Sequence, residues 1–136
     1  ILKKNIFGFS NTGFKICKLE DYIEFPVGLR IVDWYFYTLL LQQNAKAVFL
    51  GNSLSNYRQH SSNMIGIGSY SVENFKRMAQ LKYEHFYYLN QKDTFFKDEL
   101  KKSKDIVNML EVSISDIIEQ KKRNIQYPLW WEIVNV

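Results

Sequence analysis

The chain has 136 residues, of which 46% are hydrophobic and 24% are charged. This balance is typical of a globular domain with its own core and excludes an intrinsically disordered chain. The net charge of +4 comes from basic and acidic residues that are interspersed, so no basic stripe points to a nucleic-acid partner. Cys17 is the only cysteine in the sequence, which excludes an internal disulfide and the cysteine-based zinc motifs and fits a reducing compartment.

The first half of the chain mixes short apolar runs with turn residues. In residues 7–16 the apolar side chains of Phe7, Phe9, Phe14 and Ile16 flank a glycine-containing turn, which predicts short strand pieces. Residues 30–45 are apolar nearly all round and predict a buried helix that ends near Asn44. Two further candidate strands follow at residues 47–50 and 52–60.

The second half has a helical pattern. Ser71 is a suitable N-cap for a helix, and the next helix is expected to start near Asp93 or Thr94. The expected apolar stripe of the first of these helices comprises Val72, Phe75, Ala79, Tyr83 and Phe86. The expected seam of the second comprises Phe96, Leu100, Ser103, Val107, Leu110, Ile114 and Ile117. The short connection predicts that the two helices pack as an antiparallel hairpin.

The composition changes near Gly68, from mixed to strongly helical. We therefore predict an α+β fold that is predominantly helical, with short strands in residues 1–68 and a long helical hairpin in residues 69–136. The longest charge-free apolar stretch, residues 34–45, is too short to span a bilayer.

Asp33 is the first candidate for chemistry, because it interrupts the apolar helix. A carboxylate among Ile31, Val32, Trp34 and Tyr35 is costly to bury unless it is paired, caps the helix or has a function. Two interpretations stay open: a helix N-cap or exposed first-turn acid, and a catalytic group.

Arg58 and His60 are the second pair of candidates. They stand two residues apart, where a predicted strand enters a loop that contains Gly66 and Gly68. An arginine suits a phosphate and a neutral imidazole suits a divalent metal. The structural alternative for His60 is a hydrogen bond at a strand edge. His85 lies within an amphipathic helix, and there we expect a structural or exposed side chain.

Read together, these stretches resemble the C-terminal part of an inverting family-two glycosyltransferase of the GT-A fold. The resemblance covers roughly residues 7–68 and depends on the order and spacing of its motifs. These are Asp33-Trp34 on a helix, a short strand at residues 47–50, and Tyr57-Arg58-Gln59-His60 followed by Asn63 and Gly66. The segment Gly8–Phe14 would match the strand that faces the acceptor in such enzymes.

The resemblance implies a role for each candidate. Asp33 would be the base that takes a proton from the acceptor hydroxyl, Arg58 would bind the donor diphosphate, and His60 would hold a divalent metal, Mn²⁺ or Mg²⁺. The donor would be a nucleoside-diphosphate sugar, and the acceptor a glycan or lipid-linked molecule in polysaccharide biosynthesis. The nucleotide-binding half, with its Asp-x-Asp motif, would lie before Ile1. We therefore expect the chain alone to turn over no sugar nucleotide.

A second function class stays open beside this one. The hairpin pattern also suits a non-catalytic helical interaction domain, including a homodimer formed through the C-terminal helices. Trp130 and Trp131 fit either a peripheral contact with a membrane or an ordinary core. The expected location is the cytoplasm, with the inner face of the membrane as the alternative site.

Overall fold

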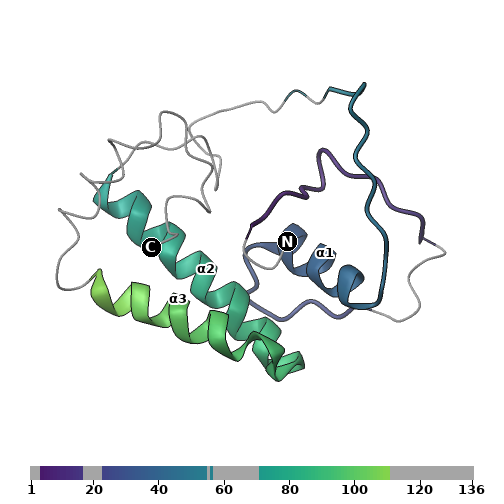
Figure 1. Ribbon diagram of the computed structural model, residues 1–136. Coiled ribbons are helices and arrows are strands. Elements are labelled where there is room, and N and C mark those ends of the chain that lie inside the picture. Colours follow the sequence, from purple (N-terminus) through teal and green to yellow (C-terminus); the bar gives the residue numbers. More distant parts are fainter. Residues whose placement is uncertain (1–3, 17–22, 55, 57–70, 111–136) are drawn as a thin grey trace. The chain divides into compact units, whose positions relative to one another are not determined.

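The computed structural model describes residues 4–16, 23–54, 56 and 71–110 (Figure 1). In this part the chain forms the helices α1 (Val32–Gln42), α2 (Val72–Lys92) and α3 (Lys97–Met109), with a short 3-10 helix η2 (Thr94–Phe96). The described protein is therefore predominantly helical, as predicted. Its contacts define two compact units, Ile1–Arg58 and Gln59–Val136. The predicted division at residue 68 lies outside the described residues and stays a prediction.

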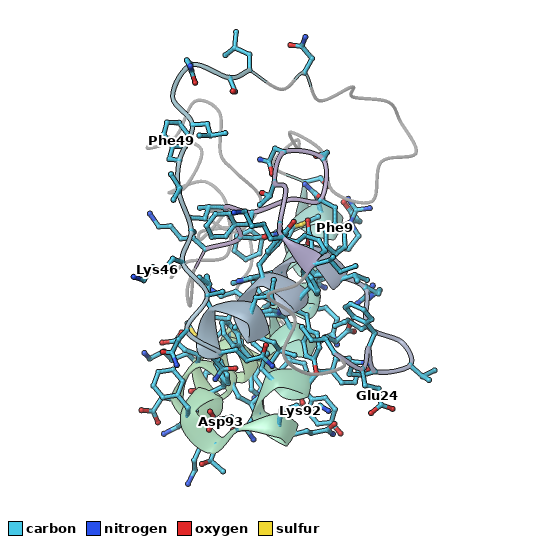
Figure 2. The ribbon with its side chains drawn as sticks, turned by 90° about the vertical axis from the view of Figure 1, so that its right-hand side faces the viewer. Phe9, Glu24, Lys46, Phe49, Lys92 and Asp93 are labelled. Atoms are coloured by element: carbon cyan, nitrogen blue, oxygen red, sulfur yellow. The ribbon has the colours of Figure 1, made fainter. Side chains whose placement is uncertain are left out.

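The predicted strands are not seen in the described part of the chain: residues 7–15 and 47–50 form neither helix nor strand, and Ile16 has a 3-10 conformation. A strand needs a neighbour to receive its backbone hydrogen bonds, and no described segment supplies one. Between α1 and residue 54 the chain exposes large apolar side chains instead. Val48 is 81% exposed, Phe49 92% and Leu54 99% (Figure 2).

Helix α1 ends where the sequence predicted, and its last carbonyls are satisfied locally. Asn44 takes a positive φ of 61°, which asparagine tolerates better than most residues. The Asn44 N–H donates to the carbonyl of Leu41 at 3.2 Å, and the Ala45 N–H donates to the carbonyl of Leu40 at 3.1 Å. This pair of bonds is the Schellman motif, and the packing of Ala45 against the cluster that contains Leu40 completes it.

Helix α1 is buried on more than one side, as its nearly continuous apolar sequence predicted: Trp34, Tyr35 and Thr38 are buried as well as Phe36, Tyr37 and Leu40. One face carries the cluster of Phe36, Tyr37 and Leu40, and Phe7 and Ile23 pack against it from the segments that precede the helix. Residues three and four apart lie on the same face of a helix, so this face also includes Asp33. The N-terminal segment is therefore held over the face of α1 that carries the candidate base.

Helix α2 begins at the predicted cap. The Ser71 side chain accepts a hydrogen bond from the Asn74 N–H at 3.1 Å. Phe75, Ala79 and Phe86 of the predicted stripe are buried, whereas Val72 is 36% exposed and Tyr83 is only half-buried. The buried residues of α2 are Phe75, Met78, Ala79, Leu81, Lys82, His85, Phe86 and Leu89. The predicted stripe was too narrow: it left out the apolar Met78, Leu81 and Leu89 as well as Lys82 and His85. A lysine can be buried because its hydrocarbon stem is apolar.

The predicted hairpin is confirmed for the described residues. Helices α2 and α3 contact each other along their lengths and run in opposite directions (Figure 1). Asp93 makes the turn between them: its N–H donates to the carbonyl of Leu89 at 2.9 Å, and its side chain accepts from the Phe95 N–H at 2.9 Å. One residue thus closes α2 and caps η2.

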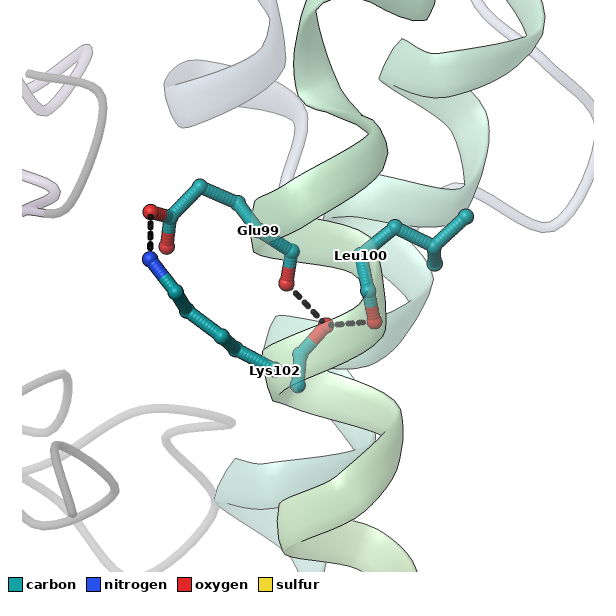
Figure 3. A network of polar contacts seen from close by, with 4 residues as sticks. Glu99, Leu100 and Lys102 are labelled. Atoms are coloured by element: carbon teal, nitrogen blue, oxygen red, sulfur yellow. Dashed lines mark hydrogen bonds and ion pairs between the residues drawn. The ribbon is translucent and has the colours of Figure 1, made fainter.

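The seam of α3 follows the predicted spacing. Phe96, Ser103 and Leu110 are buried, and Leu100 and Val107 are half-buried. The Ser103 hydroxyl donates to the carbonyls of Glu99 and Leu100, at 2.8 and 2.9 Å, which makes its burial tolerable (Figure 3). The predicted continuation through Ile114 and Ile117 lies outside the described residues.

None of the described helices is long and apolar enough to cross a membrane.

We predict that Leu110→Asp destabilises the hairpin by about 3 kcal/mol or more, because it places an unpaired charge at a buried position. Leu110 is 4% exposed, whereas its neighbour Met109 is 51% exposed. Met109→Asp is therefore the matched control and should change the free energy of unfolding little. Urea denaturation followed by helical circular dichroism measures both variants. Equal stability of the two would show that Leu110 is not part of the seam.

His85 gives the hairpin a predicted dependence on pH. The side chain is 1% exposed, and its ring packs on Phe86 with centroids 5.1 Å apart. Burial, with a smaller contribution from Lys82, lowers the pKa of His85 from 6.5 to about 3. The His85 side chain therefore binds a proton below about pH 6.5 in the unfolded chain, whereas in the folded chain it stays neutral until the pH approaches 3. The associated stability is fully present above pH 6.5 and is lost as the pH falls toward 3.

We expect the free energy of unfolding to fall by about 2 kcal/mol between pH 7 and pH 5 because of His85. His85→Leu should abolish most of this fall. His60→Gln changes the only other histidine and should leave the fall in place. Urea denaturation at both pH values makes the comparison, and the same pH dependence in wild type and His85→Leu would contradict the assignment.

Candidate functional site

The candidate site begins with Asp33, in the first turn of α1. The N-cap is Ile31, which offers no side-chain hydrogen bond, so Asp33 is not the cap but the second helical residue. Its half-buried carboxylate accepts hydrogen bonds at Oδ1 from the Trp34 N–H at 2.7 Å and from the Asn5 Nδ2 amide at 3.3 Å, and the backbone N–H of Asp33 itself is a further donor to the carboxylate. One oxygen of the carboxylate is thus used to fix its orientation.

A tight turn of the N-terminal segment lies beside this carboxylate. The Asn11 N–H donates to the carbonyl of Gly8 at 3.1 Å, and Asn11 Oδ1 accepts from the Gly8 N–H at 2.8 Å and from the Thr12 hydroxyl at 3.0 Å. Tyr37 ties the turn to α1, because its hydroxyl donates to the carbonyl of Thr12 at 3.2 Å. The turn therefore keeps a fixed place over the first turns of the helix.

Gly8 is the point where this turn comes nearest to Asp33. A β-carbon at Gly8 would stand 3.6 Å from Asp33 Oδ2 and 3.4 Å from Asn11 Oδ1. Gly8 does not take a positive φ, so the backbone conformation does not require glycine here. The missing side chain instead leaves room next to Oδ2, the oxygen that neither Trp34 nor Asn5 contacts.

The surroundings raise the pKa of the Asp33 carboxyl above its ordinary value of 3.8. Burial is the largest cause, and the hydrogen bonds from Trp34 and Asn5 oppose it. A carboxylate with a raised pKa holds a proton more firmly, so it is a better general base than an exposed aspartate. Perturbed carboxylates of this kind are enriched at functional sites.

Aromatic rings continue the site along the same face of α1. Phe9, Phe14 and Phe25 surround the buried Phe36 ring, with centroid distances of 5.5, 4.9 and 6.2 Å. Each of the three outer rings is 43% to 51% exposed. Because Phe36 lies three residues after Asp33, the half-exposed rings flank the face that carries the carboxylate.

The structure places Gly8, in the segment 8–14, beside the Asp33 carboxylate. Arg58 and His60 lie outside the described residues, so their predicted roles stay predictions. Within the described ranges, no three His, Cys, Asp or Glu side chains come together as metal ligands. Sequence reasoning missed Asn5 and Tyr37. No pattern identifies Asn5, whereas the spacing of four residues between Asp33 and Tyr37 could have placed Tyr37 on the same helix face.

Comparisons with known proteins found no matching family model, no similar curated protein and no similar solved structure. The functional assignment therefore depends on the residues themselves.

Proposed function

We propose that the protein supplies the acceptor side of an inverting glycosyltransferase, with Asp33 as its catalytic base. The observation that carries this proposal is the state of the Asp33 carboxylate. Oδ1 is held by two N–H donors, Oδ2 lies beside a glycine without a side chain, and burial raises the pKa of the group. This combination fixes the base and leaves one oxygen for a substrate hydroxyl.

In the proposed reaction, Asp33 Oδ2 accepts the proton of an acceptor hydroxyl. The acceptor oxygen then forms a bond to the anomeric carbon of the donor sugar, from the face opposite the leaving group. The bond between that carbon and the diphosphate oxygen breaks, and the nucleoside diphosphate leaves with the electron pair. Inversion follows from attack on the opposite face.

The leaving group needs positive charge, which the resemblance assigns to Arg58 and to a metal at His60. A bound Mn²⁺ or Mg²⁺ would stabilise the charge that develops on the diphosphate. The resemblance places the remaining donor-binding residues in a nucleotide-binding half of the intact enzyme. The half-exposed rings of Phe9, Phe14 and Phe25 suit a sugar ring or the apolar part of a lipid-linked acceptor, and the proposed location is the cytoplasm or the inner face of the membrane.

The second candidate function is a non-catalytic helical interaction domain. The regular seam of the hairpin favours it, since such seams also join separate chains. In the described part, however, the buried residues of α2 and α3 face a helix of the same chain. Because these buried residues already pack within the chain, they are not a surface for a partner, and the catalytic proposal is the better supported one.

We predict that Asp33→Asn lowers turnover of the intact enzyme by about 10²–10⁴-fold, the usual contribution of a general base. Asparagine keeps the size of the side chain and can still accept a hydrogen bond, so folding should be preserved. Donor affinity should stay close to normal, because the base touches the acceptor and not the diphosphate. Turnover, donor binding and the melting temperature test this together. Near-normal turnover in the variant would remove Asp33 from the mechanism.

A second prediction concerns the space beside Oδ2. Gly8→Ala places a methyl group 3.6 Å from Asp33 Oδ2 without a steric clash, so the variant should fold. Its methyl would exclude the acceptor hydroxyl, and kcat/KM for the acceptor should fall roughly 10–100-fold. Gly13→Ala is the matched control, since its β-carbon meets nothing within 4 Å. If the two variants have equal activity, the acceptor does not approach Asp33 past Gly8.

A further inference from the structure

Asn5 is a buried amide whose position is not explained by the packing of the first unit. The side chain is 8% exposed, although Lys4 and Ile6 on either side of it are exposed. Its Nδ2 group donates to Asp33 Oδ1 at 3.3 Å, across 28 residues of sequence. The contact joins the N-terminal segment to the first turn of α1.

The other end of the amide makes its burial costly. Asn5 Oδ1 is buried and accepts no hydrogen bond from any described residue. The amide cannot be reversed to correct this, because its oxygen would then face the Asp33 carboxylate, which has no proton to donate. A leucine of similar size would pack in this place without an unsatisfied oxygen, so the fold alone gives no reason for an asparagine.

We propose that Asn5 is a positioning residue, whose amide holds Asp33 Oδ1 so that Oδ2 is presented to the acceptor hydroxyl beside Gly8. This inference rests on the proposed role of Asp33. The Trp34 N–H alone fixes one point of the carboxylate, and the bond from Asn5 approaches the same oxygen from another segment of the chain. Two donors on one oxygen restrict rotation of the carboxylate far more than one donor does.

The charges around Asp33 agree with this role. The hydrogen bond from Asn5 lowers the pKa of Asp33 and so opposes the effect of burial. Tyr37 lies one turn further along α1, and the pKa of its hydroxyl is raised chiefly by burial, with a smaller contribution from the Asp33 carboxylate. Without the Asn5 amide, Asp33 would hold its proton more firmly and would be available as a base only at higher pH.

The test uses Asn5→Leu, which removes the donor and the unsatisfied oxygen together. The carboxyl carbon of Asp33 is followed by NMR during a pH titration of the chain, and its signal is identified by its loss in Asp33→Asn. We expect the pKa of Asp33 to rise in Asn5→Leu, while the melting temperature stays the same or increases. Asn52→Leu, at an exposed asparagine, is the control and should change neither quantity.

In the intact enzyme, the acid limb of the turnover profile should move to higher pH in Asn5→Leu, in the same direction as the pKa of Asp33. Donor affinity should be unchanged. If Asn5→Leu does not fold, Asn5→Asp keeps the shape, and its added carboxyl should also raise the pKa of Asp33.

An unchanged pKa of Asp33 in folded Asn5→Leu would overturn the proposal. A lower melting temperature of this variant with an unchanged pKa of Asp33 would overturn it as well. The latter result would show that Asn5 is purely structural. The outcome is separate from that of the proposed function: if Asp33 were not the base, its pKa would still respond to Asn5, but Asp33→Asn would retain turnover.

Discussion

The hydrogen bonds to Asp33 Oδ1 are the constraint on which the first unit depends. They come from the Trp34 N–H, within α1, and from the Asn5 amide, in the N-terminal segment. The second of these bonds joins two parts of the chain that are 28 residues apart, and the Tyr37 hydroxyl makes a similar connection to Thr12 one turn later. Together they hold the Gly8 turn over the carboxylate. A core of only a few buried rings would otherwise constrain this segment weakly.

The two units differ in how completely their helix ends are capped and their apolar side chains are buried. In the hairpin, the helix ends are capped by Ser71 and Asp93, and the buried Ser103 hydroxyl bonds to the backbone of its own helix. In the first unit, α1 has no side-chain cap, and large apolar side chains after α1 are exposed.

The sequence predicted the helices better than the site, for a physical reason. Helix ends are set by local chemistry, so Ser71, Asp93 and Asn44 could be identified from residue type alone. The strands could not be predicted from local residue types in the same way, because a strand depends on hydrogen bonds to a neighbouring strand, which is often far away in sequence. The predicted stripe of α2 was right at Phe75, Ala79 and Phe86 and wrong at Val72 and Tyr83. It also left out Lys82 and His85, which are buried in spite of their polarity. Asp33 was identified as an anomaly in an apolar helix. Asn5 was missed, because its role comes from a contact across 28 residues that no local pattern encodes.

In the proposed reaction, Asp33 accepts the proton of the acceptor hydroxyl. The most direct measurement is to compare, in the intact enzyme, the pKa of the Asp33 carboxyl from NMR with the pKa of the acid limb in the pH dependence of kcat/KM. Both describe the free enzyme, so they must agree if Asp33 is the base. The account predicts that the two values coincide and lie above the ordinary 3.8 of an aspartate. An acid limb that is clearly separate from the titration of Asp33 would contradict it.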